Sequence, residues 1–314
     1  MLSVGIDIGG MSIKTGLVDE NGLIIDSKRS ITSKDSKIDV GNIVSDIKTL
    51  LHSHSLSEHD IAGIGIGCPG AVSPEKGIVD VFPNLGWYNV PLVEMIKKEF
   101  NLPVRISNDA NAAVLAETVY GAAKGFKNVI MFTLGTGVGG GVVIDGKLYE
   151  GNDGKGAELG HSTLILGGIP CACGRSGCIE CYVSATALIR QTKDAMKNNP
   201  DSKLWRICND NIENVNGKAA FDGEMAGDST AKQVVDTYCK YLSESMMNMF
   251  NIFRPEAFIL GGGISAQGDN LTKRIKNYCE EHFYGYKLAP KVEILTAKLG
   301  NDAGIIGASL LIRK

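Results

Sequence analysis

Three glycine-rich turns, each directly after an apolar segment, contain the residue types best suited to binding phosphate. They lie at residues 7–10, 135–141 and 261–265. Glycine allows close approach and positive φ, so consecutive backbone N–H groups can point at phosphate oxygens, and the hydroxyl of Thr136 or Ser265 can add a donor. Asp7 could hold Mg²⁺, which neutralises phosphate charge during phosphoryl transfer. One such turn alone is more often a plain hairpin or bulge, but three together indicate a phosphate site.

The common phosphate-binding fingerprints do not fit these turns. A P-loop needs Gly-Lys followed by Ser or Thr, and none of the three turns has that sequence. The second turn opens a hairpin and not a helix, so its context rules out a dinucleotide fingerprint. We therefore expect hairpins to hold the phosphates.

A second candidate for chemistry is Asp109, in the segment Ser107-Asn108-Asp109-Ala110-Asn111 between an expected strand and an expected helix. Ligands of α/β sheets bind at the carboxyl ends of strands. A carboxylate there could take the proton of a substrate hydroxyl as its oxygen attacks phosphorus, which is typically worth about 10² to 10⁴ in rate. Asn108 could orient neighbouring hydroxyls. From this segment alone, capping of the helix by Asn108 or Asp109 is an equally good interpretation.

A cysteine cluster gives the strongest local signal. Four of the eight cysteines fall between residues 171 and 181, at spacings too tight for an ordinary disulfide framework. Cys171, Cys173 and Cys178 together predict a zinc site, to which His161 or Cys181 could supply the fourth ligand. Four protein ligands leave no position for water, so this zinc is expected to be structural.

Two carboxylates, Glu158 and Glu180, flank the predicted zinc loop. On a loop held rigid by a metal they could accept hydrogen bonds from the hydroxyls of a sugar. The second ring nitrogen of a zinc-bound His161 could donate another. Taken alone, both carboxylates could equally be surface charges.

The elements expected to position these residues alternate between strand and helix. Strands are expected at 4–8, 13–18, 23–26, 61–67, 104–106, 129–134, 138–144, 147–148, 257–260 and 292–297, and helices at 40–52, 110–120, 229–249 and from 304. The hairpin around the first glycine turn and the hairpin around the second have the same pattern. This weak duplication predicts a fold of two similar α/β halves.

Length and composition are consistent with that interpretation. A chain of 314 residues is long enough for two lobes, and two lobes imply a cleft. With 44% hydrophobic and 21% charged residues it has an ordinary globular composition, and its net charge of −3 without a basic stripe argues against nucleic acid as a partner. No leader pattern precedes the first strand and no apolar run could span a membrane, so we expect a cytoplasmic protein without a membrane partner.

Taken together, these segments resemble the ROK family of sugar kinases and repressors over nearly the whole chain. The family's first phosphate motif matches residues 7–10, its catalytic motif matches 108–112 with Glu117, and its second phosphate motif matches 134–141. The most specific match is the signature Glu158-Leu159-Gly160-His161 followed by Cys171-x-Cys173-Gly174-x-x-Gly177-Cys178-x-Glu180. Residues 68–70 and 83–87 look most like the family's bacterial glucokinase branch.

The resemblance implies an α/β, actin-like (ribonuclease H-like) ATPase fold with two lobes around a central cleft. We expect a small N-terminal lobe of residues 1–118 plus about 300–314, and a large C-terminal lobe of residues 119–299 with the zinc loop at 161–181. The resemblance also implies a homo-oligomer, either a dimer or a tetramer.

The same resemblance implies the roles of the site residues, with Asp109 as the base. Structural zinc is held by His161, Cys171, Cys173 and Cys178, which leaves out Cys181. The sugar is contacted by Gly70, Asn84, Asn108, Asp109, Glu158, His161 and Glu180. ATP with Mg²⁺ lies near Asp7, Gly9, Gly10, Lys14, Gly135, Thr136, Gly137, Gly139, Gly261, Gly262 and Gly263.

Two residues depart from the family pattern. Met11 stands where the family usually has threonine after the paired glycines, which removes one hydroxyl donor to phosphate. We expect weaker ATP affinity or turnover as a result. Ala116 replaces the usual glycine before Glu117, and alanine suits a helix.

The implied activity is ATP-dependent phosphorylation of glucose at its 6-hydroxyl, a step of glycolysis, giving glucose 6-phosphate and ADP. N-acetylmannosamine is the first alternative substrate, followed by fructose, allose and N-acetylglucosamine, because specificity depends on loop geometry. A repressor of this family would carry a helix-turn-helix domain ahead of Asp7, for which we expect no room. A non-catalytic sugar sensor would be expected to lose Asp109 or the glycine turns, which are intact apart from Met11.

Overall fold

The chain divides into two compact units. The computed structural model describes residues 1–33, 35–282, 284 and 291–313. The first unit comprises Met1–Lys127, Gly141–Ala157 and Lys298–Lys314, and the second comprises Asn128–Gly140 and Glu158–Ala297. The lobes expected from the sequence stay a prediction. The compact units differ from them in placing residues 119–127 and 141–157 with the first unit, where Gly141 packs against Val114.

The first unit is built on a five-stranded sheet in the order β3-β2-β1-β4-β8. β2 pairs antiparallel with both β1 and β3, whereas β4 pairs parallel with both β1 and β8. The strands are β1 (Leu2–Ile8), β2 (Ser12–Val18), β3 (Ile24–Ile31), β4 (Ile61–Cys68) and β8 (Val104–Asn108). A separate antiparallel sheet consists of β5 (Ala71–Ser73), β6 (Ile78–Phe82) and β7 (Trp87–Val90).

A second five-stranded sheet has the order β11-β10-β9-β12-β13. Its strands are β9 (Val129–Leu134), β10 (Val138–Ile144), β11 (Lys147–Leu148), β12 (Ala257–Gly261) and β13 (Glu293–Thr296). β9, β12 and β13 are mutually parallel, and β10 and β11 are antiparallel. If the strands of each sheet are numbered from one to five along the chain, both sheets have the order 3-2-1-4-5. This shared order confirms the predicted duplication of an α/β half.

The four predicted helices are present with changed ends, and the other helices of the structure were not predicted. The first unit contains α1 (Ser36–Ser53), α2 (Leu92–Lys97), α3 (Asp109–Val119) and α10 (Ala303–Leu310). The second contains α4 (Glu180–Val183), α5 (Ala185–Asn198), α6 (Leu204–Ile207), α7 (Ala219–Met225), α8 (Ser229–Phe253) and α9 (Asp269–His282). The predicted helices are α1, α3, α8 and α10. Short 3₁₀ segments are η1 (Glu58–Asp60), η2 (Pro83–Leu85), η3 (Leu159–His161), η4 (Ile212–Asn214), η5 (Gly263–Gln267), η7 (Gly300–Asp302) and η8 (Leu311–Arg313). None of the helices described is both long enough and apolar enough to cross a membrane.

Helix α1 covers one face of the first sheet. It begins at Ser36, earlier than the predicted residue 40, because the Asp35 side chain accepts the backbone N–H of Lys37 and so caps the helix. Its buried residues recur every three or four positions and share one core with alternate residues of β1, such as Ile43 and Ile47 with Ile6. The amphipathic pattern therefore fixes which side of α1 faces the sheet.

Helix α10 approaches the other face of the same sheet through a row of glycines. Gly16, Gly5 and Gly65 lie side by side on β2, β1 and β4. A Cβ at Gly5 would lie 2.0 Å from the carbonyl oxygen of Ile305, and one at Gly65 would lie 1.8 Å from that of Ala308. Because side chains alternate along a strand, these glycines face away from the core under α1. The helix backbone thus rests directly on the strand backbones.

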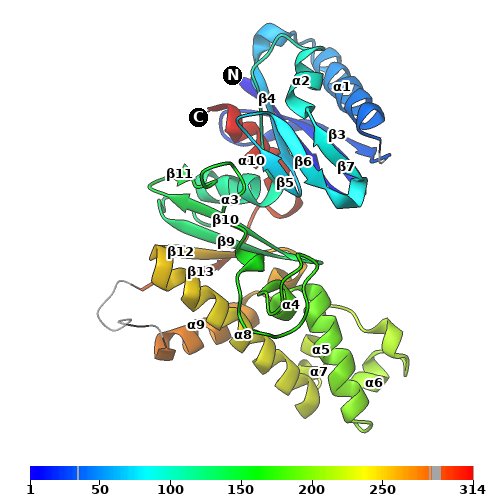
Figure 1. The fold of residues 1–314 in the computed structure, drawn as a ribbon, viewed down its shortest axis with the longest axis vertical. Helices are drawn as coiled ribbons and strands as arrows, with labels where there is room; N and C mark the ends of the chain where they lie inside the picture. Colours follow the sequence, from blue (N-terminus) through cyan, green and yellow to red (C-terminus); the bar gives the residue numbers. More distant parts are fainter. Residues whose placement is uncertain (34, 283, 285–290, 314) are drawn as a thin grey trace. The chain divides into compact units, whose positions relative to one another are not determined.

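Helix α10 also lies against α3, as Figure 1 shows. The contact again depends on glycine, since a Cβ at Gly307 would lie 1.8 Å from the carbonyl oxygen of Ala112. Ala116 of α3 is fully buried in a small cluster with Ala303 and Ile306 of α10. The helix that follows Asn108 is therefore fixed against α10, and α10 is fixed against the sheet.

Replacing Gly5 with alanine is expected to lower the free energy of unfolding by about 3 kcal/mol or more, because the new methyl group would collide with backbone that cannot rotate away. Gly41→Ala is the matched control. Gly41 lies inside α1, and apart from its neighbours and the backbone of its own helix no atom lies within 4 Å of the place that a methyl group would take, so alanine should stabilise by about 0.5–1 kcal/mol. Urea unfolding of the three proteins measures both. Equal stability of Gly5→Ala and the wild type would contradict the close approach.

Candidate active site and metal cluster

Within the first unit, Asp7 and Asp109 lie at the carboxyl ends of parallel strands. Asp7 of β1 is in register with Gly67 of β4, and a Cβ at Gly67 would lie only 3.7 Å from the Cα of Asp109. Both carboxylates influence the pKa of the buried Cys68 thiol. Burial is the main reason that its pKa is raised, and the negative charges of Asp109 and Asp7 raise it further. The two predicted carboxylates are therefore neighbours at the strand ends, where α/β sheets bind ligands.

Lys14 gives Asp7 its electrostatic setting. The Lys14 Nζ lies 3.3 Å from Asp7 Oδ2 and donates a second hydrogen bond of 3.0 Å to the carbonyl oxygen of Asn301. Burial raises the pKa of Asp7, and the charge and hydrogen bond of Lys14 oppose that rise. A Cβ at Gly304 would lie 2.5 Å from the Asp7 carboxyl carbon, so the first turn of α10 touches this carboxylate. Asp7 is thus held between a lysine and a helix start.

Asn108 caps the helix that begins with Asp109. Its Oδ1 accepts the backbone N–H of Ala110 at 2.9 Å, and its Nδ2 donates to the carbonyl oxygen of Gly70 at 3.3 Å. The capping interpretation, left open by the sequence, is therefore correct for Asn108. The cap also brings Gly70 to the same strand end, and the helix N-terminus favours a negative charge on Asp109.

Two other predicted sugar contacts lie close by. Gly70 has φ of +87°, and a Cβ there would lie 2.2 Å from the carbonyl oxygen of Val81, so only glycine fits without strain. Asn84, in η2, is exposed, and its Nδ2 lies 3.9 Å from where a Cβ of Gly10 would be. The first glycine turn itself is closed by a hydrogen bond from Gly9 N to Ser12 O at 2.9 Å. The first unit therefore gathers Asp7, the Gly9–Gly10 turn and these sugar candidates.

Glu117 links the end of α3 to the segment before α10 through hydrogen bonds that the sequence did not indicate. Its side chain is completely buried, and its two oxygens accept the backbone N–H groups of Leu299 and Ala122, each at 2.7 Å. Leu299 precedes the turn whose Asn301 carbonyl accepts Lys14. The family motif marked Glu117 as a residue of interest, but its partners lie far along the chain and no local pattern indicates them.

In the second unit, the other two glycine turns lie at the same end of the sheet. β9 and β12 are parallel, with Thr133 in register with Gly261. Gly262 has φ of +80°, and a Cβ there would lie 2.5 Å from the carbonyl oxygen of Leu134, directly before the other turn. The Ser265 hydroxyl, considered above as a phosphate donor, instead donates to the carbonyl oxygen of Gly262 at 2.7 Å. Residues 135–137 and 261–263 are thus adjacent.

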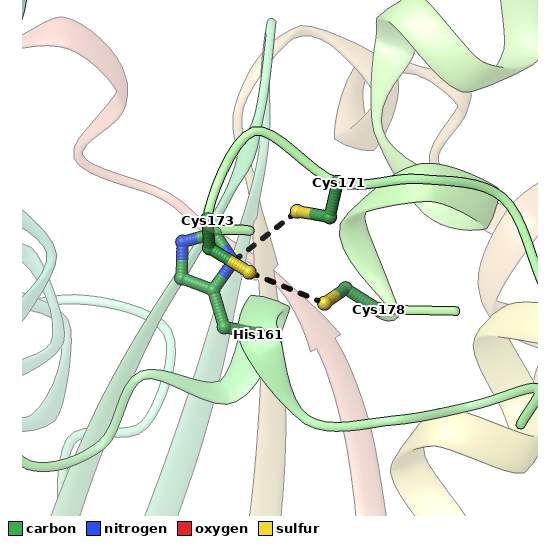
Figure 2. Close-up of side chains that lie close together, drawn as sticks. All are labelled: His161, Cys171, Cys173 and Cys178. Atoms are coloured by element: carbon green, nitrogen blue, oxygen red, sulfur yellow. Dashed lines mark hydrogen bonds between the residues drawn. The ribbon is translucent and has the colours of Figure 1, made fainter. Parts of the chain in front are cut away.

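A cluster of one histidine and three cysteines lies on the predicted zinc loop. The ligand atoms of His161, Cys171, Cys173 and Cys178 all lie within 4.8 Å of one another (Figure 2). The Sγ atoms of Cys173 and Cys178 are 3.6 Å apart, and the Cys171 Sγ is 3.7 Å from the His161 Nδ1. Two sulfurs bound tetrahedrally at about 2.3 Å from one zinc would be roughly 3.8 Å apart. The donor set and its spacing are therefore compatible with structural zinc.

Cys181 is outside this cluster. Its thiol lies 3.6 Å from the carbonyl oxygen of Pro170 and does not belong to the four-residue group. Burial raises the pKa of the Cys178 thiol, whereas a hydrogen bond from the backbone of Arg175 lowers the pKa of Cys173, and a bound cation would favour the thiolate form of both. Of the two candidates that the sequence left open for the fourth ligand, the structure brings His161 into place.

Three predicted sugar contacts of the second unit lie beside this cluster. His161 directs its Nδ1 into the cluster, which leaves Nε2 for another partner (Figure 2). Burial raises the pKa of Glu158, the charge of Glu180 raises it further, and His161 lowers it. Glu180 accepts the backbone N–H of Val138 through Oε2 at 2.8 Å. No local pattern indicates this last bond, which reaches the second glycine turn.

The chain resembles known proteins along its full length. The model of the ROK family matches residues 3–314. A glucokinase of Halalkalibacterium halodurans is 38% identical over 99% of this chain and 94% of that protein. The crystal structure of a ROK family glucokinase from Streptomyces griseus, in complex with glucose and AMPPNP, has a TM-score of 0.82 and 33% identity, covering 100% of this chain and 99% of that one. A xylose repressor of Bacillus spizizenii is 31% identical over 99% of this chain and 76% of the repressor.

The substitution Lys14→Met is expected to raise the pKa of Asp7 further. Lys14 lowers that pKa and burial raises it, so without Lys14 only the raising effect remains. Titration of the side-chain carboxyl carbon by NMR should show protonation of Asp7 at a higher pH than in the wild type. Lys48→Met, which removes an exposed partner of Glu99, should leave the titration unchanged. A lower or unaltered midpoint in Lys14→Met would contradict the assigned ion pair.

Proposed function

This chain belongs to the ROK family, and from that membership we propose that it phosphorylates glucose at the 6-hydroxyl with ATP, giving glucose 6-phosphate and ADP. Its fold is the α/β, actin-like ATPase fold of the family's sugar kinases. The observation that carries the proposal is the placement of Asp109 beside Asp7 at the ends of parallel strands. Full-length similarity to glucokinases, and a similar structure solved with glucose and AMPPNP, support glucose and ATP as the substrates.

In this proposal Asp109 is the general base. It takes the proton of the glucose 6-hydroxyl while that oxygen forms a bond to the γ-phosphorus, and the bond from this phosphorus to the β,γ-bridging oxygen breaks to release ADP. The capping bond of Asn108 and the packing of α3 against α10 hold the carboxylate in one place. A fixed base is worth more than a mobile one, because no energy is spent on orienting it during reaction.

The nucleotide is assigned to the three glycine turns with Asp7 and Lys14. Within each unit the assigned residues converge at the carboxyl ends of strands. Mg²⁺, when bound, supplies charge neutralisation at the phosphates, and the carboxylate of Asp7 is an oxygen ligand of the kind that Mg²⁺ prefers. The sugar contacts are assigned to Gly70, Asn84, Asn108, Asp109, Glu158, His161 and Glu180.

The metal cluster is assigned to structural zinc, held by His161, Cys171, Cys173 and Cys178. A closed set of four protein ligands has no position for a reacting water, so its effect is to fix the loop between Glu158 and Glu180. We also propose a cytoplasmic location, where ATP is available, and assembly as a dimer or tetramer.

The test of function is ADP release from ATP and Mg²⁺ with glucose, N-acetylmannosamine, N-acetylglucosamine, fructose and allose, compared by kcat/KM. The highest value with glucose would support the proposal. Preference for another sugar would keep the mechanism and change the substrate, because a pocket discriminates strongly when one substrate leaves a buried polar group unpaired. Absence of ADP release with every sugar would overturn the kinase assignment and favour a sugar sensor.

Asp109→Asn is expected to lower kcat by about 10² or more while glucose still binds, because the amide keeps a hydrogen bond but cannot accept the proton. Steady-state kinetics and calorimetric glucose titration measure the two effects. Asp201→Asn, on an exposed residue, is the control and should match the wild type. Unchanged turnover in Asp109→Asn would sink the assignment of the base.

Cys173→Ser is expected to lose zinc and to bind glucose more weakly, because the loop that carries Glu158 and Glu180 loses its cross-link. Cys181→Ser should keep one zinc per chain, since Cys181 is outside the cluster. Elemental analysis of the purified proteins checks both. Stoichiometric zinc in Cys173→Ser, or its loss in Cys181→Ser, would contradict the ligand set.

A further inference from the structure

The second glycine turn is held from outside by the segment that follows the metal cluster. The Glu180 Oε2 accepts the backbone N–H of Val138 at 2.8 Å. The backbone N–H of Ala185 donates to the carbonyl oxygen of Gly135 at 2.8 Å, and the Thr186 hydroxyl donates to the carbonyl oxygen of Thr136 at 2.8 Å. Three parts of the turn are therefore bonded to residues 180–186.

The hydrogen bond between Glu180 and Val138 restricts position 137 of the turn to glycine. A Cβ at Gly137 would lie 2.3 Å from Glu180 Oε2. Glycine at this position leaves room for the carboxylate of Glu180. This reason for glycine is separate from the close approach of a phosphate to the turn. The Val138 N–H is occupied by the carboxylate, so it shapes the turn and is not one of the donors offered to a phosphate. The remaining N–H groups of the turn then depend on this anchor for their direction.

Glu180 is also tied to the metal cluster. It is two residues after the ligand Cys178, whose backbone bridges to Thr163 on the other side of the loop. The intervening Ile179 donates its N–H to the carbonyl oxygen of Ser162 at 2.9 Å. The carboxylate therefore extends from a braced backbone to the glycine turn, and a carboxylate can accept several hydrogen bonds at once.

We propose that Glu180 is a positioning residue for the nucleotide turn at 135–138, in addition to its assigned sugar contact, so that one carboxylate couples the two ligands. A sugar hydroxyl bound to Glu180 holds the carboxylate in place, and the carboxylate holds Val138. Bound glucose then stabilises the conformation of the turn that binds nucleotide. Because such coupling is reciprocal, bound nucleotide raises the affinity for glucose by the same factor. The inference rests on the proposed function for the identity of the two ligands, and on geometry for the link between them.

Glu158 provides a matched comparison. It is the other carboxylate assigned to the sugar and lies next to the same cluster, with its charge influenced by His161 and Glu180. Among the described residues it makes no hydrogen bond to residues 135–138. A variant of Glu158 therefore removes a sugar contact without touching the turn, whereas a variant of Glu180 removes both.

The experiment measures the affinity of AMPPNP with Mg²⁺ by calorimetry, first without sugar and then with saturating glucose. Without sugar, Glu180→Ala should weaken nucleotide binding about tenfold, because a hydrogen bond to a charged group is lost. Glu180→Gln should recover most of this affinity, since its amide oxygen can still accept the Val138 N–H. Glu158→Ala should bind nucleotide as the wild type does. Glucose should tighten nucleotide binding in the wild type and have no such effect in Glu180→Ala.

Each other outcome is decisive. Wild-type nucleotide affinity in Glu180→Ala without sugar, or an equal loss in Glu158→Ala, would overturn the positioning role while leaving the proposed kinase intact. Failure of the wild type to bind AMPPNP would instead overturn the proposed function. If circular dichroism shows that Glu180→Ala does not fold, Thr186→Val removes a neighbouring bond to the same turn at an exposed position. It should weaken nucleotide binding about threefold, and Thr186→Ser should restore it. No loss in Thr186→Val would contradict the premise that nucleotide affinity depends on how residues 180–186 hold the turn.

Discussion

The first unit depends on the close approach of α10 to the strands β1 and β4. Gly5 and Gly65 leave only backbone between the sheet and the helix, at distances where any Cβ would collide. Asp7 is two residues beyond Gly5, on the same face of β1, so the contact that seats α10 also places its first turn against this carboxylate. Since α10 in turn holds α3, Asp109 is fixed by the same contact. A contact between backbone atoms cannot be relieved by a change of side-chain rotamer, so the contact of α10 with the sheet holds the two carboxylates rigidly.

The second unit positions its glycine turn by another means. The loop from Glu158 to Glu180 has few helices or strands of its own, so close packing of the kind seen around α10 is not available to it. The histidine and cysteine cluster of this loop is compatible with a structural metal, and binding a metal supplies folding energy where a loop has little core of its own. The glycine turn then takes its position from side-chain bonds that start at residues 180–186. A side-chain anchor can respond to a ligand, whereas a backbone contact cannot.

The two departures from the family pattern have different consequences. Met11 is 82% exposed, and the turn before it is supported without its side chain, because Thr32 donates its hydroxyl to Gly10 O at 3.0 Å and its N–H to Met11 O at 3.3 Å. The shape of the turn therefore does not depend on a threonine hydroxyl at position 11. Ala116 is fully buried against α10, where its methyl group adds packing and helix propensity.

The sequence by itself indicated the ten strands of the two five-stranded sheets, the helices α1, α3, α8 and α10, the duplicated halves, the three glycine turns and three members of the histidine and cysteine cluster, because each is encoded in periodicity or spacing within a short stretch. It did not indicate the sheet of β5, β6 and β7 or the remaining helices. The resemblance of motifs added the roles of Asp109 and the sugar candidates. Only the tertiary structure decided what holds them. It joined Glu117 to Leu299 across 182 residues, and it joined Glu180 to Val138 across 42. Such bonds depend on how distant strands align and how closely helices approach them, which no local pattern of side chains specifies.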